Sequence, residues 1–347
     1  MAIISDVDPR RAALTLAIGA VGAVIALFAA FPAPYLLGPA IALTIASFAG
    51  LRLGVPMALR NVCFVVIGIT MGTSVTPAVI EAARTWPASF LLLMPAIAVI
   101  FYGAYAVLER GFGYDRRTAM LAASPGHLSF IISLSADTRS DVAAISIIQS
   151  VRVLALTLMV PLIVQVFDLV SVAPPLLLAD MPLAVLAAEI LASVAVGMLF
   201  LRWRFPAALL LGGVAVSVSS HISGLVSGGV PAWLTIPVYV VLGCVIGTRF
   251  SGLSFFAMRR AFVAGAVTTL LVTLLAGLAS WLVSWLTGVP LNAVLIAFAP
   301  GGLETMAAMA VMMHVDATYV GSHHVLRLLF LSVFMPLVVR DRKDKTS

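Results

Sequence analysis

Two stretches of this sequence carry the same pattern and decide its fold. Residues 122–138 read AASPGHLSFIISLSADT, and residues 297–313 read AFAPGGLETMAAMAVMM. An offset of 175 positions aligns their Pro-Gly pairs and continues downstream without a gap. The matched residues that follow are Asp141 and Asp316, Arg152 and Arg327, and Pro161 and Pro336. Chance similarity between apolar segments would align Leu, Val and Ala, so matched Pro, Asp and Arg residues indicate an internal duplication.

The duplication extends over most of the chain. The same offset places Gly54-Val55-Pro56 on Gly229-Val230-Pro231. We therefore predict two membrane repeats, residues 1–168 and 182–347, joined by a linker at 169–181. The linker is marked by Pro174-Pro175 and Asp180, which interrupt the apolar pattern.

The composition indicates a membrane protein. The chain has 347 residues, of which 62% are hydrophobic and 10% are charged, whereas about one quarter of a typical soluble domain is charged. This excludes an ordinary soluble enzyme, and no basic face with interleaved aromatics suggests nucleic-acid binding. Apolar segments such as 34–51 and 58–77 recur along both halves, with lengths near the roughly 20 residues that cross a bilayer. We predict an all-α polytopic membrane protein.

The arginines orient the two repeats, because positive residues gather on the cytoplasmic side of membrane proteins. If every apolar segment crossed, giving twelve full spans, the arginines of the two halves would fall on opposite sides. If segments 118–136 and 292–313 are broken or re-entrant, about ten spans remain, the repeats are inverted, and the arginines share one side. We favour ten spans and keep twelve as the alternative. The protein is then expected in the inner membrane with both termini in the cytoplasm.

The Pro-Gly pairs predict helix breaks that form a binding site. Proline and glycine interrupt helical hydrogen bonding, and the helix that restarts presents unpaired N–H groups and a partial positive charge. Paired interruptions in two repeats are a strong sequence indication of a transporter's site near the bilayer midplane. The alternative is that Pro and Gly only kink or pack the helices. The candidate substrate-binding residues are Pro125, Gly126, His127, Ser129, Pro300, Gly301, Gly302, Glu304, Arg152 and Arg327.

The matched arginines need partners, since a charge inside an apolar segment costs about 3 kcal/mol on insertion scales. Arg152 and Arg327 have three candidate partners: a substrate anion, helix carbonyls, or Asp141 and Asp316. Each Asp lies eleven residues before its Arg, so an ion pair between them would not be an ordinary contact between neighbouring helical turns. The sequence leaves open whether these arginines bind substrate or hold the neighbouring Pro-Gly loop.

Four acids are candidates for coupling or structural roles. Glu304 follows the second Pro-Gly pair and is either a helix-start acid or a carrier of a coupling proton or cation. Its counterpart in the first repeat is Ser129, which has no carboxylate. Asp141, Asp316 and Glu189 are the other candidates, and Glu189 lies mid-segment without an acidic counterpart.

The sequence gives no sign of a metal or cofactor. The five histidines lack metal-ligand spacing, and the adjacent His323 and His324 would diverge by about 100° on a helix. Cys63 and Cys244 lie in separate apolar runs, and we interpret them as buried packing residues that form no disulfide. Motifs for nucleotide binding and hydrolysis are absent. We expect no cofactor, no bound metal and no enzyme activity.

The duplicated Pro-Gly segment, followed in each half by an Asp and an intramembrane Arg, resembles the repeats of the bacterial AbrB membrane protein family. The resemblance covers nearly the whole chain and implies a duplicated integral membrane fold. The first repeat departs from the family form Pro-Gly-Gly-Leu-Ser/Thr-Glu, because residues 125–130 read PGHLSF and contain no acid. Members often carry the labels ammonia monooxygenase or AbrB family regulator. An unrelated soluble DNA-binding regulator shares the name, and its small β-rich domain cannot be this chain.

Together these observations predict a secondary transporter of a small anionic or zwitterionic solute. Inverted repeats would give alternating access, with a proton or Na⁺ as coupling ion. The alternative is a membrane protein that acts in regulation of gene expression, and a membrane-bound monooxygenase agrees less well with the dispersed histidines. The expected partners are the lipid bilayer and a small solute, with a homodimer left open and no nucleic acid.

Overall fold

The computed structural model describes residues 7–73, 86–125, 140–167, 169, 179–203, 205, 207–253 and 258–339. The elements of the first half are α1 (Pro9–Phe28), α2 (Pro34–Phe48), α3 (Met57–Gly72), α5 (Trp86–Ala106), η2 (Val107–Gly111), α6 (Arg116–Ala123) and α8 (Val142–Val166). Those of the second half are α9 (Leu183–Arg202), α10 (Ala208–Ile222), α11 (Ala232–Gly247), η3 (Thr248–Phe250), α12 (Arg259–Thr287), α13 (Leu291–Phe298), α14 (Leu303–Met312) and α15 (Ala317–Val339).

The predicted all-α polytopic membrane fold is confirmed. Among the described residues, six helices are long and apolar enough to cross a membrane: α1, α5 with η2, α8, α9, α11 with η3, and α12. Helices α2, α3 and α10 have 15, 16 and 15 residues. At about 1.5 Å per residue they are shorter than the roughly 30 Å hydrocarbon core. The number of spans, ten or twelve, stays a prediction.

The helix boundaries of the two halves correspond. Helices α1 and α2 begin and end 174 residues before α9 and α10, and α3 and α6 do so 175 residues before α11 and α13. Ala33, before α2, and Ala207, before α10, both have a left-handed φ, of 47° and 50°. Contacts are also exchanged, because α2 packs on α11 and α3 packs on α10. This correspondence favours the predicted duplication, while the inverted orientation and the domain limits stay predictions.

Glycines allow helices of different halves to cross at short distance. A Cβ atom on Gly68 of α3 would overlap the carbonyl oxygen of Leu210 in α10. In the same way, a Cβ atom on Gly243 of α11 would overlap the carbonyl oxygen of Leu36 in α2. Small residues let membrane helices approach backbone to backbone. These two crossings join the halves and fix the positions of α3 and α11.

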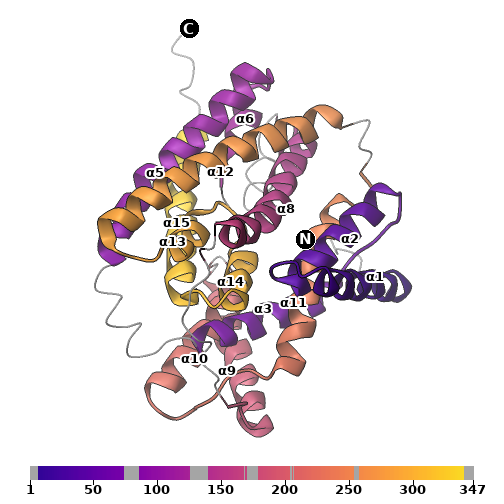
Figure 1. The fold of residues 1–347 in the computed structure, drawn as a ribbon, viewed down its shortest axis with the longest axis vertical. Helices are drawn as coiled ribbons and strands as arrows, with labels where there is room; N and C mark the ends of the chain where they lie inside the picture. The colour runs from indigo at the N-terminus through magenta and orange to yellow at the C-terminus, as the bar shows by residue number, and fades with distance from the viewer. Residues whose placement is uncertain are drawn as a thin grey trace.

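The helix break predicted for the second repeat is present. Helix α13 ends at Phe298, helix α14 begins at Leu303, and residues 299–302 between them are not helical. Figure 1 shows α14 near the middle of the molecule, and α8 and α3 both contact it. In the first repeat, α6 ends at Ala123, two residues before Pro125 of its Pro-Gly pair.

The outer helices present apolar side chains away from the protein. Phe28 of α1, Leu191 of α9 and Trp285 of α12 are 86%, 72% and 71% exposed. Apolar surface this extensive is unfavourable in water. It is the expected exterior of a protein in lipid. The predicted polar binding site is therefore expected inside the bundle.

Candidate functional site

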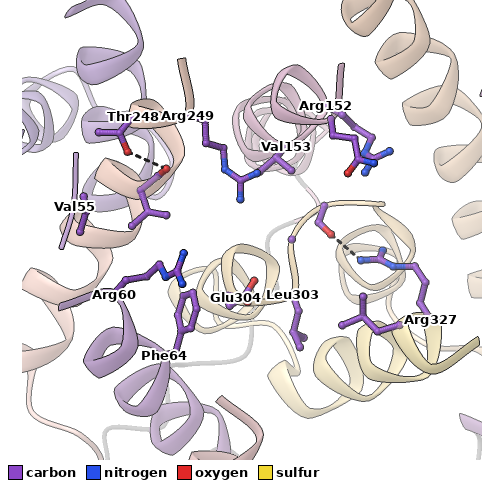
Figure 2. A pocket seen from close by; sticks show the side chains of 15 residues that line it. Val55, Arg60, Phe64, Arg152, Val153, Thr248, Arg249, Leu303, Glu304 and Arg327 are labelled. Carbon is purple, nitrogen blue, oxygen red and sulfur yellow. Dashed lines mark hydrogen bonds between the residues drawn. The ribbon is translucent and has the colours of Figure 1, made fainter. Parts of the chain in front are cut away.

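Side chains from both halves line a cavity beside the break between α13 and α14. Its volume is about 340 Å³, near the lower end of the roughly 300–1,000 Å³ typical of small-molecule sites. The lining residues, many of them labelled in Figure 2, are Val55, Arg60, Phe64, Gln149, Arg152, Val153, Val245, Thr248, Arg249, Gly301, Gly302, Leu303, Glu304, Arg327 and Leu328. We call this cavity the arginine pocket, because four arginines line it.

Arg327 of α15 holds the end of α13 and the break that follows it. Its Nη1 donates to the carbonyl oxygen of Ala299 at 2.8 Å. Its Nη2 donates to that of Gly301 at 2.7 Å, the bond drawn at Arg327 in Figure 2. The last carbonyls of a helix have no partner within the helix, and the helix dipole favours a cation there. Arg327 therefore supplies, from another helix, hydrogen bonds that the interrupted helix cannot make.

Arg152 of α8 makes the corresponding contact in the first repeat. Its Nη1 donates to the carbonyl oxygen of Ser124 at 3.1 Å. Ser124 directly follows α6, just as Ala299 directly follows α13. The side chains of Arg152 and Arg327 are 5% and 2% exposed. Of the partners considered for these arginines, helix carbonyls are therefore present.

His324 belongs to the same arrangement, although it was not among the predicted site residues. Its Nδ1 accepts from Nη2 of Arg327 at 2.8 Å, so its proton lies on Nε2, because a neutral imidazole has one N–H. Nε2 then donates to the carbonyl oxygen of Ile296 at 2.9 Å. Gln149 takes the corresponding place and donates to the carbonyl oxygen of Leu121 at 2.9 Å. Their shared position, three residues before each matched Arg, is the signal that could have found them.

Two further arginines line the pocket and were missing from the predicted site. Arg60 lies in the first turn of α3, 5.6 Å from the ring centroid of Phe64. Arg249 lies in η3, at the end of α11. Figure 2 shows both guanidinium groups pointing toward the middle of the pocket, with Glu304 facing them. Their places at helix ends made them look like cytoplasmic surface charges.

The four guanidinium groups form one electrostatic network. Arg249 is attracted by Glu304 and repelled by Arg60. Arg152 is repelled by Arg249, and Arg327 is repelled by Arg152. Glu304 lies in the first turn of α14, where a carboxylate is favoured by the free N–H groups of the helix start. It is the only acid among the residues found to line the pocket.

The two matched aspartates begin helices. The carboxylate of Asp141 accepts from the backbone N–H of Ala144 at 2.9 Å, and that of Asp316 accepts from the N–H of Tyr319 at 2.9 Å. Within the described ranges, neither aspartate is paired with Arg152 or Arg327. The ion pairs considered from the sequence are thus not formed. The two aspartates instead cap the N-termini of α8 and α15.

The structure brings together half of the predicted substrate-binding residues. Those that line the arginine pocket are Gly301, Gly302, Glu304, Arg152 and Arg327. Pro125 and Pro300 are not among its lining residues. Gly126, His127 and Ser129 lie outside the described residues.

Glu189 and the cysteines lie elsewhere in the bundle. Glu189, on α9, is 4% exposed and does not line the pocket. Cys63 and Cys244 are buried free thiols, as predicted. Across the described part of the chain, no three His, Cys, Asp or Glu side chains gather as metal ligands.

Comparison with known proteins gives a family and two relatives. The sequence matches the family described as "Transition state regulatory protein AbrB" over residues 35–342. It is 26% identical over 309 residues to "Uncharacterized protein YhjN" of Bacillus subtilis (strain 168). This match covers 81% of this chain and 80% of that protein. It is 23% identical over 316 residues to "Putative regulator AbrB" of Escherichia coli (strain K12). This match covers 89% of this chain and 90% of that protein. Neither name states a substrate.

Proposed function

The chain belongs to the AbrB family, and on that premise we propose that it is a membrane transporter of a small anionic or zwitterionic solute. The observation that carries the proposal is the arginine pocket, where four arginines meet beside a broken helix within a bundle of apolar helices. Ionisable residues inside membrane segments mark substrate and ion pathways. Broken helices in duplicated transporters form substrate sites near the bilayer midplane.

The arginines have different roles in this proposal. Arg152 and Arg327 hold the broken helices through carbonyl contacts, while Arg60 and Arg249 bind the solute. Glu304 is the candidate for the coupling proton or Na⁺, because it shares the pocket with Arg249. The protein lies in the inner membrane with both termini in the cytoplasm, and its inverted repeats alternate access to the pocket. The proposal includes no catalytic step and no cofactor.

Transport by reconstituted protein tests the proposal. Liposomes containing the full chain are assayed for uptake of radiolabelled succinate, sulfate and glycine. We expect at least one of these solutes to accumulate above the level in empty liposomes. Arg249→Gln should reduce that uptake at least tenfold, whereas Arg52→Gln, at an exposed arginine outside the pocket, should not. Folded protein that takes up none of the three solutes would contradict the proposal.

The name of the Escherichia coli relative, a regulator, favours a second candidate function. A membrane protein can alter gene expression indirectly by changing the concentration of a metabolite that a soluble regulator senses. A deletion strain complemented with Arg249→Gln separates the two functions. If transport is primary, transcript levels follow the loss of transport. If the chain signals through a partner protein, the variant keeps wild-type transcript levels.

A further inference from the structure

The arginine pocket holds more positive charge than its own residues neutralise. Arg60, Arg152, Arg249 and Arg327 line it, and Glu304 is the only acid among the lining residues that the structure describes. Electrostatic repulsion links all four guanidinium groups. It acts between Arg327 and Arg152, between Arg152 and Arg249, and between Arg249 and Arg60. Among the described lining residues, four positive charges and one negative charge leave an excess of three. Because charges interact more strongly in a protein interior than in water, this excess favours an anion.

Several arginine nitrogens are buried and have no hydrogen-bond partner among the residues that the structure describes. They are Nε of Arg152 and Nε of Arg327, whose side chains are 5% and 2% exposed, and Nε of Arg60 and Nη1 of Arg249. A buried donor without an acceptor is unfavourable, and more so when it is charged. All of these atoms are donors, so the ligand that would satisfy them is rich in acceptor oxygens.

Resting on the proposed transport function, we propose that the solute is a small dianion, either a dicarboxylate or a tetrahedral oxyanion. Carboxylate and phosphate-like oxygens match the fork of N–H groups on a guanidinium. A zwitterion adds no net charge, and its ammonium group would face four guanidinium groups. A monoanion leaves most of the positive charge in place. The cavity of about 340 Å³ restricts the solute to small molecules.

Glu304 competes with the solute for Arg249. The carboxylate of Glu304 attracts Arg249 in this structure, and Figure 2 shows it facing Arg60 and Arg249 across the pocket. A bound dianion therefore shares these cations with Glu304 and is repelled by its charge. Neutralising Glu304 strengthens solute binding, which makes Glu304 the residue that weakens affinity and permits release.

Equilibrium binding to the purified full chain tests this inference separately from transport. Calorimetric titrations in detergent use succinate, sulfate, acetate and glycine as probes, in a buffer free of other carboxylates and oxyanions. We expect succinate or sulfate to bind at least tenfold more tightly than acetate and glycine. Arg249→Gln and Arg60→Gln should each weaken dianion binding at least tenfold. Glu304→Gln should strengthen it, whereas the controls Arg52→Gln and Glu189→Gln, both outside the pocket, should match wild type.

The outcomes separate this inference from the proposed function. Acetate or glycine binding as tightly as the dianions overturns the inference, and so does failure of both dianions to bind to folded protein. Unchanged dianion binding in both Arg249→Gln and Arg60→Gln also overturns it, and two variants guard against misfolding of either one. Dianion binding without any transport overturns the proposed function and leaves the inference intact. The tighter of succinate and sulfate identifies the dianion class.

Discussion

At the residue scale, the role of each arginine depends on which of its nitrogen atoms already have partners. Nη1 and Nη2 of Arg327 are occupied by the carbonyl oxygens of Ala299 and Gly301. Arg60 instead contacts the sulfur of Met57 and the ring of Phe64, both on its own helix. The fold therefore fixes the position of Arg327, while Arg60 can exchange its weak local contacts for contacts with a ligand.

Removing these two side chains should separate stability from binding. Arg327→Ala leaves two buried carbonyl groups without partners, at about 1–3 kcal/mol each, so we expect a loss of about 3 kcal/mol or more. Arg60→Ala should cost less than about 1 kcal/mol, because exposed or half-exposed charge contacts contribute little. Thermal unfolding midpoints of the purified variants measure both effects. Equal losses in the two variants would show that Arg327 does not stabilise the break.

Repeat symmetry explains which site residues could be predicted. Arg152, Arg327 and Glu304 follow the matched Pro-Gly pairs, so the sequence marks them. Arg60 and Arg249 have no matched arginine, since the offset of 175 places Thr235 and Ser74 at those positions. A cation at a helix end is ordinary in a membrane protein. The packing of α3 on α14, and of α11 and η3 on α8, brings these two arginines into the pocket.

At the element scale, the pocket depends on two helix crossings. Gly68 lets α3 approach α10, and Gly243 lets α11 approach α2. Arg60 lies at the start of α3, and Arg249 directly follows α11. Because a helix moves largely as a unit, a crossing that is forced apart shifts the arginine at the end of the helix. The glycines therefore determine the shape of the site without touching it.

Adding a methyl group at these crossings should destabilise the protein. Gly68→Ala and Gly243→Ala place a Cβ atom against a backbone carbonyl, and overpacking of this kind costs about 1–3 kcal/mol. The matched control is Gly277→Ala in α12, where a Cβ atom meets nothing within 4 Å. Since Ala is the better helix former, the control should gain up to about 1 kcal/mol. Thermal unfolding in detergent measures these changes, and a loss in the control equal to that at the crossings would refute this explanation.

The sequence predicts the helix break more reliably than it predicts the ends of the helices. The break between α13 and α14 was predictable, because the missing N–H of Pro300 is a local property of the sequence. The residues at which the helices end were less predictable. Apolar residues continue past Phe48, where α2 ends, as far as Leu51. The apolar segment 34–51 is therefore longer than the helix, since an apolar side chain does not mark the last helical turn.

At the scale of the whole molecule, the halves interlock around one pocket. Helices α2 and α3 of the first half pack on α11 and α10 of the second, and the pocket takes its arginines from both halves. The predicted topology places the start of α3 and the end of α11 on the cytoplasmic side, together with Arg52. On that topology we predict that the pocket is reached from the cytoplasm, as in an inward-facing state of a transporter.

Chemical labelling of sealed vesicles tests this orientation. Thr248 lines the pocket beside Arg249, so in a Cys63→Ala/Cys244→Ala background, Thr248→Cys provides a single reactive thiol there. A membrane-impermeant methanethiosulfonate that carries a sulfonate is attracted by the arginines. We expect it to modify this thiol at least tenfold faster in inside-out vesicles than in right-side-out vesicles.

Two exposed positions calibrate the labelling. Arg52→Cys should react from the same side as Thr248→Cys, and Ser223→Cys, after α10, should react from the opposite side. If Thr248→Cys reacts only from the side of Ser223→Cys, the pocket opens outward and the inward-facing assignment is wrong. If Arg52→Cys and Ser223→Cys react from one side, the ten-span topology itself fails. Succinate or sulfate should slow the reaction of Thr248→Cys alone, because only that thiol shares the arginine pocket with the solute.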